Sequence, residues 1–515
     1  MSRINTNIAS LTAQRVLGQN NKNLGTALER LSTGLRINRG KDDPAGLIAS
    51  ENLRGDLSSL NSAVTNAERA DQVVNIAEGG LQEISSLLTE LQGLLTASAS
   101  SAGLSTEEKE ANQLQIDSIL QTVDRISGSA SFQGIKLLNG NFDYQTTSVD
   151  SGVTDFAVNG AKFETSSLSV DAIVTQSAQK GGLFLELGAS ASGAAGEISL
   201  GGSNSAFVVE ISGSEGSREL SFSSGQTLGQ IAAAINSFSE VTGVEASVSG
   251  TGVVLSSTTF GSEAFTSVKV SDDGGITDNG ASATLGVYEL EDENFADASS
   301  TTYTFTSSAA GNGVRDDGQD IAGTINGIVA TGNGKELSIN TDFLDVEFTL
   351  DDTTSQTLGS VAAFDISGGG ADFQLAGEVN IAGKVSLGIG DISTRKLGDS
   401  TNGFLDQLGK GRDFNVVTGS DADLSTAQKI VSQATKQVSA TRGRLGAFQK
   451  NVVGATVRSL GITIENTTAA ESVIRDADFA AETAALTRNQ ILVQASTSSL
   501  AQGNQQPTNI LALLG

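Results

Sequence analysis

The 515-residue chain contains no cysteine, no histidine and no tryptophan, and only one methionine and two prolines. Without cysteine it has neither a disulfide framework nor thiol chemistry. Without histidine it lacks the commonest general base and a common metal ligand. A serine nucleophile would need a lysine or carboxylate beside it, and a zinc site would need carboxylates alone. The composition therefore predicts that the chain is not an enzyme and holds no metal or cofactor.

Long apolar runs are also lacking. The first residues, MSRINTNIASLTAQ, are polar and amphipathic and do not contain the apolar core of a cleavable signal peptide. No stretch reaches the roughly 18 consecutive apolar residues that a membrane-spanning helix needs. We therefore expect no membrane association, and either a cytoplasmic location or export by a route without a cleaved signal.

Negative charge is concentrated in the middle of the chain. Of the net charge of −28, residues 141–400 contribute −26, from 35 acidic and 9 basic side chains. The two ends together carry 24 acidic and 22 basic side chains. An acidic middle should repel nucleic acid and anionic membranes, whereas nearly neutral ends are typical of surfaces that contact other proteins.

Heptad spacing dominates the N-terminal region. Leu17, Leu24 and Leu31 lie seven residues apart, and Leu28 and Leu35 are expected at the second seam position. After a break the seven-residue period resumes and runs without interruption through Leu53, Leu60, Ala67, Val74, Leu81, Leu88 and Leu95. Six consecutive intervals of seven predict a long coiled-coil helix.

Two local signals complete this region. GLSTEE predicts the start of another helix, with Ser105 as N-cap and Glu108 three residues later in a capping box. GSASFQGIKLLNG, with its glycine-marked turns, predicts a β-hairpin.

The break between the two heptad patterns is RINRGKDDPAGLIASENLR, Arg36 to Arg54. Gly34 and Gly40 favour the end of the first helix. Asp43 suits an N-cap and Pro44 suits the first helical position, where its missing N–H is no loss. The segment therefore predicts a joint between two helices and not a site of catalysis.

The C-terminal region has matching spacing. Leu445, Phe448, Val452, Ala455 and Ile462 follow steps of three, four and seven, and DADLSTAQKIV opens the helix before them. Seven-residue steps then connect Phe479, Leu486, Val493 and Leu500, before Pro507 interrupts. Neither end can bury its stripe alone in water, so we expect the two ends to pack on each other. The middle would then project as an insertion.

The middle of the chain is predicted to be rich in β-strands. AFVVEISG, RELSFSSG, GVVLSSTTF and TTYTFTSS alternate apolar and polar residues. One short helix is predicted at QTLGQIAAAINSF, where Leu228, Ile231, Ala232 and Ile235 share a face. The alternative is a disordered spacer, which the recurring Val, Ile, Phe and Leu disfavour.

Three polar motifs could suggest ligand sites. ATGNGKEL resembles a phosphate-binding loop, but Val329 stands where the first glycine is required and Glu336 where Ser or Thr should be. SDDGGITDNG and RDDGQD could bind a cation, but neither has the spacing of a calcium loop. We interpret all three as turns.

Motifs at both ends resemble bacterial flagellin. At the N-terminus these are INTNIASLTAQRVL, ALERLSTGLRINRGKDDPAGLIASENLR and FQGIKLLNG, and at the C-terminus ESVIRDADFAAE and QILVQASTSSLAQGNQQPTNILALLG. They occur in order over roughly the first 140 and the last 115 residues. The stretch from RELSFSSG to GVVLSST also resembles the hook IN-type motif found in flagellins.

The resemblance implies an α+β multidomain fold, in which both chain ends build long helical coiled-coil domains and β-rich outer domains are inserted between them. We expect an inner-core helical domain from residues 1–42 with 475–515. A tube-wall helical domain with a β-hairpin would use 43–176 with 401–474. Residues 177–300 would form a β-rich outer domain with the IN-type motif, and 301–400 a second one.

The resemblance also implies a function: a structural subunit that polymerises into the extracellular flagellar filament for swimming motility. Flagellins are exported unfolded through the flagellar type III apparatus, with an export chaperone, and assemble beneath a cap. The expected partners are therefore further copies of the chain in a helical homopolymer, cap and hook–filament junction proteins and the export machinery. No nucleic-acid or membrane partner is expected. We expect the terminal helices to fold as they polymerise.

Three sets of residues are expected to carry assembly. The inner core would be packed by Ile4, Ile8, Leu11, Leu17, Leu24, Leu31, Leu486, Val493, Leu500, Leu511 and Leu514. The tube wall would be packed by Leu53, Leu60, Val74, Leu81, Leu88, Leu445, Phe448 and Val452. The spoke between them, with intersubunit ion pairs, would be formed by Arg36, Arg39, Lys41, Asp42, Asp43 and Pro44.

Family members are also recognised by an innate immune receptor of animals. The matching segment here contains Thr89, Glu90, Leu91 and Leu94. Receptor-activating members usually carry Arg where this chain has Glu90, so the resemblance predicts weak recognition.

Two alternatives from the sequence remain: a hook–filament junction protein with similar ends, and a surface adhesin or glycan-bearing protein.

Overall fold

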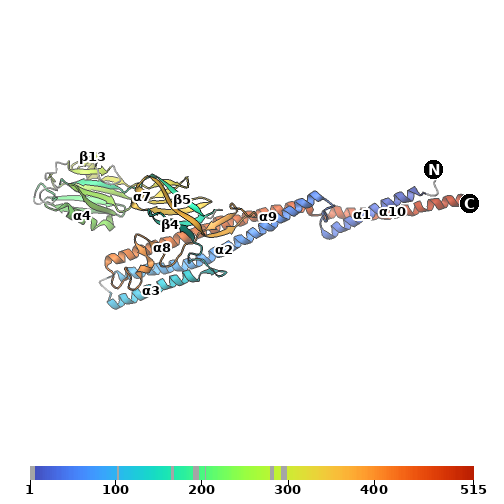
Figure 1. Cartoon of the computed structure of the whole chain (residues 1–515), viewed down its shortest axis with the longest axis horizontal. Coiled ribbons are helices and arrows are strands. Elements are labelled where there is room, and N and C mark those ends of the chain that lie inside the picture. Colours follow the sequence, from blue (N-terminus) through green and yellow to red (C-terminus); the bar gives the residue numbers. More distant parts are fainter. Residues whose placement is uncertain are drawn as a thin grey trace. The chain divides into compact units, whose positions relative to one another are not determined.

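The computed structural model describes residues 6–100, 104–163, 167–188, 196–202, 205–278, 284–290 and 298–514. The chain divides into two compact units. Unit 1 contains residues 1–74, 373–385 and 445–515, and unit 2 contains 75–372 and 386–444. The ends are helical and the middle is β-rich, which confirms the predicted α+β class (Figure 1).

Unit 1 is built mainly from helices of the two chain ends. They are α1 (Ile8–Thr33), the first part of α2 (Pro44–Ser98), the π-helical turn η2 (Phe448–Val453), α9 (Gly454–Arg475) and α10 (Phe479–Leu514). Helix α1 packs along α10, so the two chain ends pair as the heptads predicted (Figure 1). Within the described residues, no helix is long and apolar enough to cross a membrane.

The helical part of unit 2 contains the rest of α2, α3 (Thr106–Ser129) and α8 (Asp421–Ala447). Asn112 of α3 donates a hydrogen bond to Ser98 of α2 at 3.0 Å, and Arg442 of α8 pairs with Glu78 of α2 at 2.8 Å. The predicted heptad residues of α2 in this unit, Leu81, Leu88 and Leu95, are fully or almost fully buried. Ser105 and Glu108 form the predicted capping box at the start of α3.

Short elements accompany these helices. The predicted hairpin pairs β1 (Ser131–Phe132) with β2 (Ile135–Lys136). Further along lie the strand pairs β21 (Ala371–Gln374) with β22 (Lys384–Leu387) and β23 (Gly398–Asp399) with β24 (Gly403–Phe404), and the 3₁₀ turn η1 (Leu405–Leu408).

One β core of unit 2 combines strands from residues 144–176 with strands from residues 322–369. Its two sheets have the orders β16-β15-β5-β20-β3 and β17-β18-β19-β4, with antiparallel neighbours. The strands are β3 (Tyr144–Thr147), β4 (Val153–Ala161), β5 (Leu168–Gln176), β15 (Ala322–Ile325), β16 (Ile328–Val329), β17 (Thr331–Asn333), β18 (Glu336–Asn340), β19 (Leu344–Leu350) and β20 (Gly359–Gly369), with α7 (Asp352–Gln356) before β20. Phe348 and Phe364 meet in its buried centre.

The other β core is formed by strands from residues 182–317, which lie between those two groups in the sequence. Its sheets are β13-β12-β6-β10-β9 and β14-β11-β7-β8. Their bounds are β6 (Gly182–Glu186), β7 (Ala206–Gly213), β8 (Ser217–Ser223), β9 (Val244–Ser249), β10 (Gly252–Ser257), β11 (Phe265–Asp272), β12 (Gly286–Leu290), β13 (Ala298–Thr304) and β14 (Val314–Asp317). The short helices are α4 (Leu228–Asn236), α5 (Ser239–Thr242) and α6 (Ser308–Asn312). Helix α4 buries the four residues that the sequence predicted.

Strand pairing crosses the expected domain limits at residues 176 and 300. Strand β5 pairs with β15 and β20, and β12, before residue 300, pairs with β13, which continues past it. Alternation of apolar and polar residues identifies a strand but not its partner in the sheet. Pairing across the expected limits therefore could not be predicted from the sequence. The division into four domains stays a proposal.

Candidate assembly surface

The seam of the α1–α10 hairpin has one apolar row and one row of small or polar residues. On α1 the least exposed positions alternate between Leu17, Leu24 and Leu31 in one row and Ala13, Asn20 and Ala27 in the other. On α10 they alternate between Leu486, Val493 and Leu500 in one row and Asn489, Ser496 and Gly503 in the other. Only half of the seam is therefore a leucine-type coiled coil.

The polar row is hydrogen-bonded across the hairpin. Asn20 donates to the hydroxyl of Ser496 at 2.7 Å, and Ser10 donates to Asn504 at 2.7 Å. At the other end Arg30 pairs with Glu482 at 3.1 Å. Buried polar groups need such partners, and these pairs fix the antiparallel register of the two helices.

One of the two residues predicted for the second seam row, Leu28, is wrong, whereas the other, Leu35, is half-buried just after α1. Leu28 is 49% exposed, whereas the neighbouring Ala27 is buried. Alanine, serine and glycine let two helix backbones approach closely, and a leucine at that position would hold them apart. The structure thus turns Leu28 outward.

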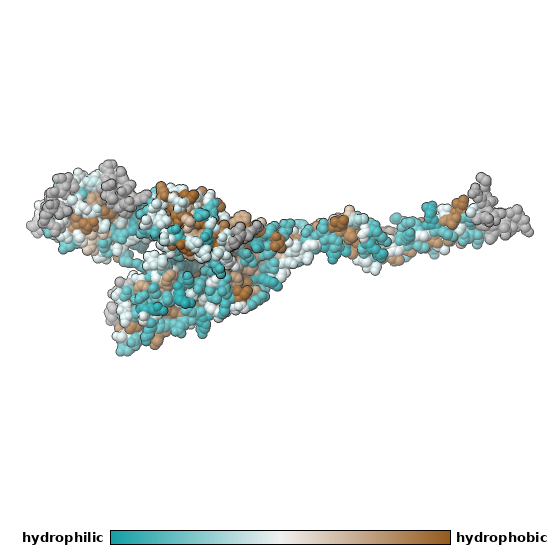
Figure 2. All heavy atoms as spheres, in the orientation of Figure 1, coloured by the Kyte–Doolittle hydropathy of each residue, from teal (hydrophilic) through white to brown (hydrophobic). Residues whose placement is uncertain are grey.

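Large apolar side chains lie on the outside of this hairpin. Ile8 and Leu11 of α1 are 63% and 61% exposed, and Phe479 and Ile491 of α10 are 70% and 61% exposed. Figure 2 shows brown apolar patches on the surface of the α1–α10 part. A groove of about 840 Å³ follows the hairpin, lined by Ile8, Val16 and Leu492 among others. The hairpin is therefore more polar inside, and more apolar outside, than an isolated helix pair should be.

The predicted inner-core residues fall into three groups by exposure. Ile8 and Leu11 are exposed, and the half-buried ones are Leu17, Leu24, Leu31, Leu486, Val493 and Leu500. Ile4 lies outside the described residues, as do the side chains of Leu511 and Leu514. None of the described members is fully buried, so each has surface left for a neighbour.

The joint between α1 and α2 follows the sequence prediction. Helix α1 ends at Thr33, and Gly34 caps it with a φ of 72°, the left-handed conformation that glycine adopts without strain. Helix α2 begins at Pro44, and Asp43 accepts a hydrogen bond from the Gly46 N–H at 3.0 Å. Sequence reasoning missed Ile37, which is 1% exposed and anchors this joint.

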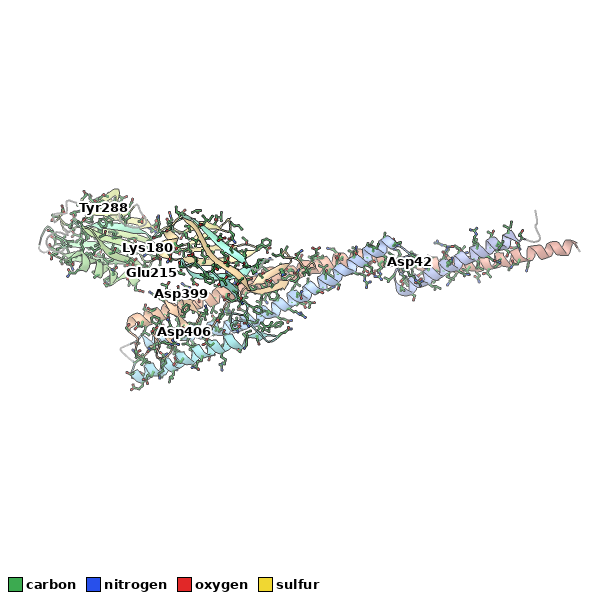
Figure 3. All side chains as sticks on the ribbon, viewed as in Figure 1. Asp42, Lys180, Glu215, Tyr288, Asp399 and Asp406 are labelled. Atoms are coloured by element: carbon green, nitrogen blue, oxygen red, sulfur yellow. The ribbon has the colours of Figure 1, made fainter. Side chains whose placement is uncertain are left out.

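The charged spoke residues make contacts inside one chain. Asp42, labelled in Figure 3, accepts a hydrogen bond from the Arg39 N–H at 2.9 Å. Arg39 pairs with Glu29 at 2.7 Å, and Arg36 donates to the Ile474 carbonyl at 2.6 Å. Lys41 and Pro44 are exposed. Intersubunit ion pairs at the spoke stay a prediction.

The predicted wall residues divide between the two units. Val74, Leu445 and Phe448 of unit 1 are buried, as are Leu81 and Leu88 of unit 2. The half-buried members are Leu53, Leu60 and Val452.

The predicted seam beyond Phe448 is out of register. Val453 and Leu460 are buried, whereas Ile462 is 61% exposed. The π-helical turn Phe448–Val453 inserts one residue, so the step after Phe448 is five and not four. Apolar spacing alone did not reveal this turn.

The segment Thr89–Leu94, for which the sequence resemblance predicts receptor recognition, lies on α2 in unit 2. Thr89 and Glu90 are exposed, Leu94 is half-buried and Leu91 is fully buried. Leu91 therefore contributes to the helical core, and the accessible part of this segment carries the negative charge of Glu90.

A cavity of about 680 Å³ in unit 2 collects acidic side chains that sequence reasoning did not single out. Asp143, Asp155 and Glu336 line it, and burial raises the pKa of each carboxyl. Arg444 of α8 also lines it and donates to the Gly388 carbonyl at 3.5 Å. Among the described residues, no group of three or more acidic side chains could hold a metal ion.

The substitution Asp143→Asn should stabilise the chain at neutral pH. Burial raises the pKa of Asp143, against smaller opposing effects that include Lys396 and Arg444. Since the folded pKa lies above the unfolded one, the stability from this group is full below the unfolded pKa and is lost as pH rises through the folded pKa. We expect the neutral amide to raise Tm at pH 7 by about 1–3 °C and to have less effect at pH 4. Thermal melts against the exposed control Glu263→Gln test this, and equal shifts at both pH values would contradict it.

Comparison with known proteins places these features among the flagellins. Models of the bacterial flagellin N-terminal and C-terminal helical regions match residues 4–143 and 428–514, and the flagellin hook IN motif matches 206–259. B-type flagellin of Pseudomonas aeruginosa and a flagellin of Salmonella rubislaw are each 30% identical over 99% of both chains. The structure of the D2-D3 domains of the flagellar cap protein from Serratia marcescens matches 40% of this chain and 94% of its own, with 17% identity and a TM-score of 0.25.

Proposed function

Because this chain belongs to the bacterial flagellin family and is a structural subunit of the flagellar filament, we propose that its paired terminal helices drive polymerisation. The supporting observation is the distribution of polarity on the α1–α10 hairpin. Asn20 and Ser496 bond to each other inside it, while Ile8, Leu11, Phe479 and Ile491 are exposed. A neighbouring copy would bury these side chains, at about 1.5–3 kcal/mol each.

In this mechanism folding of the hairpin and polymerisation are coupled. One seam row is polar, so the isolated hairpin has little apolar burial to offset the ordering of two long helices. Contacts with neighbouring copies supply the missing burial and order both chain ends. A repeated head-to-tail contact that does not close yields an open helical homopolymer.

The route to the filament is part of the same proposal. The subunit would leave the cell unfolded through the type III export apparatus, delivered by an export chaperone, and add beneath the cap beyond the hook–filament junction proteins. Absence of cysteine and the presence of only two prolines are compatible with this route, since neither disulfides nor many slow prolyl isomerisations delay refolding. The subunit would be secreted, extracellular and non-enzymatic.

Recognition by the innate immune receptor is proposed to be weak. Glu90 is exposed on α2 and carries a negative charge where activating members of the family usually have Arg. The charge at this position of the recognised surface is therefore reversed.

Removal of the last 30 residues, 486–515, should abolish filament formation. The truncated chain loses Val493, Ser496 and Leu500 and thus the α10 half of the seam. Electron microscopy after a polymerisation trial should show filaments from the full chain and none from the truncated one. Equal assembly by both would refute the terminal-helix mechanism.

The control for this experiment is the fold of the rest of the chain. All three tyrosines, Tyr144, Tyr288 and Tyr303, lie in strands of unit 2, and the chain has no tryptophan. Near-ultraviolet circular dichroism from tyrosine therefore reports on the β-rich part alone. It should be unchanged by the truncation, which separates lost assembly from general misfolding.

A further inference from the structure

Two short connections join the β cores of unit 2. The first core contains β3–β5 and β15–β20, and the second contains β6–β14. Residues 177–181 lead from β5 into β6, and residues 318–321 lead from β14 back into β15. Gln179 and Gln319 pair as an antiparallel bridge, in which each N–H donates to the other's carbonyl, at 2.8 and 2.9 Å. A ribbon of two such strands has little stability of its own and would bend easily if nothing else held the cores.

A loop of the second core extends onto the first. This clasp loop, residues 258–264, connects β10 with β11. Phe260 within it packs against the apolar cluster of the first core. Two ammonium groups lie over the Phe260 ring, since Lys180 Nζ and Lys335 Nζ are each 5.3 Å from its centre. An aromatic ring attracts cations to its face, so Phe260 is held both by apolar packing and by charge.

The two lysines are themselves fixed by carboxylates. Lys180, labelled in Figure 3, belongs to the first connection and pairs with Glu245 of β9 at 2.6 Å. Lys335 lies in the turn between β17 and β18 and pairs with Asp352 of α7 at 2.6 Å. One lysine is thus anchored to the second core and the other to the first, and Phe260 contacts both.

Asp320, in the second connection, binds both cores at once. Its carboxylate accepts hydrogen bonds from the N–H and the hydroxyl of Ser262 in the clasp loop, the first of them at 3.1 Å. It also accepts from the N–H of Gly334, in the β17–β18 turn of the first core, at 2.7 Å. Burial raises the pKa of Asp320, but these bonds outweigh it and leave the pKa below its ordinary value. The group is therefore charged at neutral pH, and hydrogen bonds to a charged acceptor are stronger than neutral ones.

Backbone packing at this junction is close enough to require glycine. A Cβ at Gly261 of the clasp loop would stand 2.6 Å from Asp320 Oδ1 and 2.8 Å from Gly334 Cα. A Cβ at Gly318 would stand 2.5 Å from the Gly261 carbonyl oxygen and 2.7 Å from that of Gln179. Both connections and the clasp loop therefore pack backbone against backbone, as in a protein interior and not as in a hinge.

We propose that the clasp loop fixes the two β cores to each other, through Phe260 and Asp320, so that they move as one rigid body. Without it the cores would be joined only by the two connections and would change their mutual orientation freely. The inference concerns unit 2 of the single chain and does not depend on the proposed assembly mechanism.

The double substitution Phe260→Ala with Asp320→Ala removes both holding side chains. Each is half-buried, so neither core loses a fully buried side chain. The matched control is Phe343→Ala with Asp351→Ala. Phe343 also lies under a lysine and Asp351 also accepts a backbone hydrogen bond, but both contacts stay within the first core.

Spin-label distances in the full-length, unpolymerised chain test the proposal, and the absence of native cysteine allows specific labelling. The spanning pair, Ser221→Cys with Ser360→Cys, has one label in each core, and the reference pair, Ser221→Cys with Ser247→Cys, lies within the second. All three serines are exposed. In the native chain we expect both pairs to give similarly narrow distance distributions. The double alanine variant should widen the spanning distribution at least twofold and leave the reference distribution unchanged, and the control should change neither.

A native spanning distribution at least twice as wide as the reference would overturn the proposal. So would a spanning distribution that the double variant leaves unchanged, or one that the control widens as much. If the double variant misfolds, which a wider reference distribution would reveal, Phe260→Ala decides alone, because this half-buried loop residue can be truncated with both cores intact. A spanning distribution of native width in that single variant would then contradict the role of the clasp loop.

Discussion

The substitution Leu11→Asp should prevent filament formation while leaving the isolated chain unchanged. Leu11 is 61% exposed on α1, so an aspartate there loses little packing within one chain. In the filament the same position would be buried against a neighbour, and both the lost apolar burial and the desolvated charge oppose assembly. We expect the critical concentration for polymerisation to rise at least about 100-fold, since about 2.7 kcal/mol per contact is enough for that factor.

The matched control is Gln19→Asp, which places the same charge at an exposed polar position of α1. Sedimentation of polymer against total concentration measures the effect, and circular dichroism of the unpolymerised chain checks its fold. Leu11→Asp filaments at the native critical concentration would show that this face of the hairpin is not an assembly surface.

Charge reversal at the joint, Asp42→Lys with Asp43→Lys, should impair filament formation more than export. Asp43 caps the start of α2 through the Gly46 N–H, and Asp42 accepts from the Arg39 N–H. Lysine can accept neither bond, so the joint loosens by about 1 kcal/mol for a lost cap and any ion pair to a neighbour is reversed. Export of an unfolded chain needs no such geometry.

The comparison variant is Asp42→Asn with Asp43→Asn, because asparagine keeps an acceptor oxygen and caps helices well. We expect it to retain most assembly if capping dominates, and to behave like the lysine variant if intersubunit ion pairs dominate. The readouts are the exported protein in the medium and the length of filaments by electron microscopy. Normal filaments from the lysine variant would remove the spoke from the assembly mechanism.

The features that the sequence predicted correctly are local ones. Asp43 before Pro44, Ser105 with Glu108, and the apolar face of Leu228–Ile235 each have a short-range physical cause, and the structure contains all three. Pairing of the chain ends was predictable because two amphipathic stripes in one chain need partners. The family of the chain followed from ordered motifs at both ends.

Features that depend on fitting two elements together were missed. A seven-residue period can place either Ala27 or Leu28 at the second seam position. Ala27 is the buried one, because α10 packs closely against α1 there. The π turn after Ala447 changes the phase of α9, but its sequence, FQKNVV, does not differ from that of an ordinary helix. Likewise β5 alternates normally, and nothing in its own residues indicates β15 and β20 as its neighbours.

Because α1 pairs with α10, the two halves of this helix pair are synthesised at opposite ends of translation. A ribosome makes Ser10 and Asn20 almost 500 residues before their partners Asn504 and Ser496, at separations of 494 and 476 residues. A nascent chain thus carries half of its pairing surface through most of synthesis without being able to use it. Under the proposed mechanism, a product that terminates before α10 lacks the partner of α1, and we expect that it is not incorporated in place of a finished subunit.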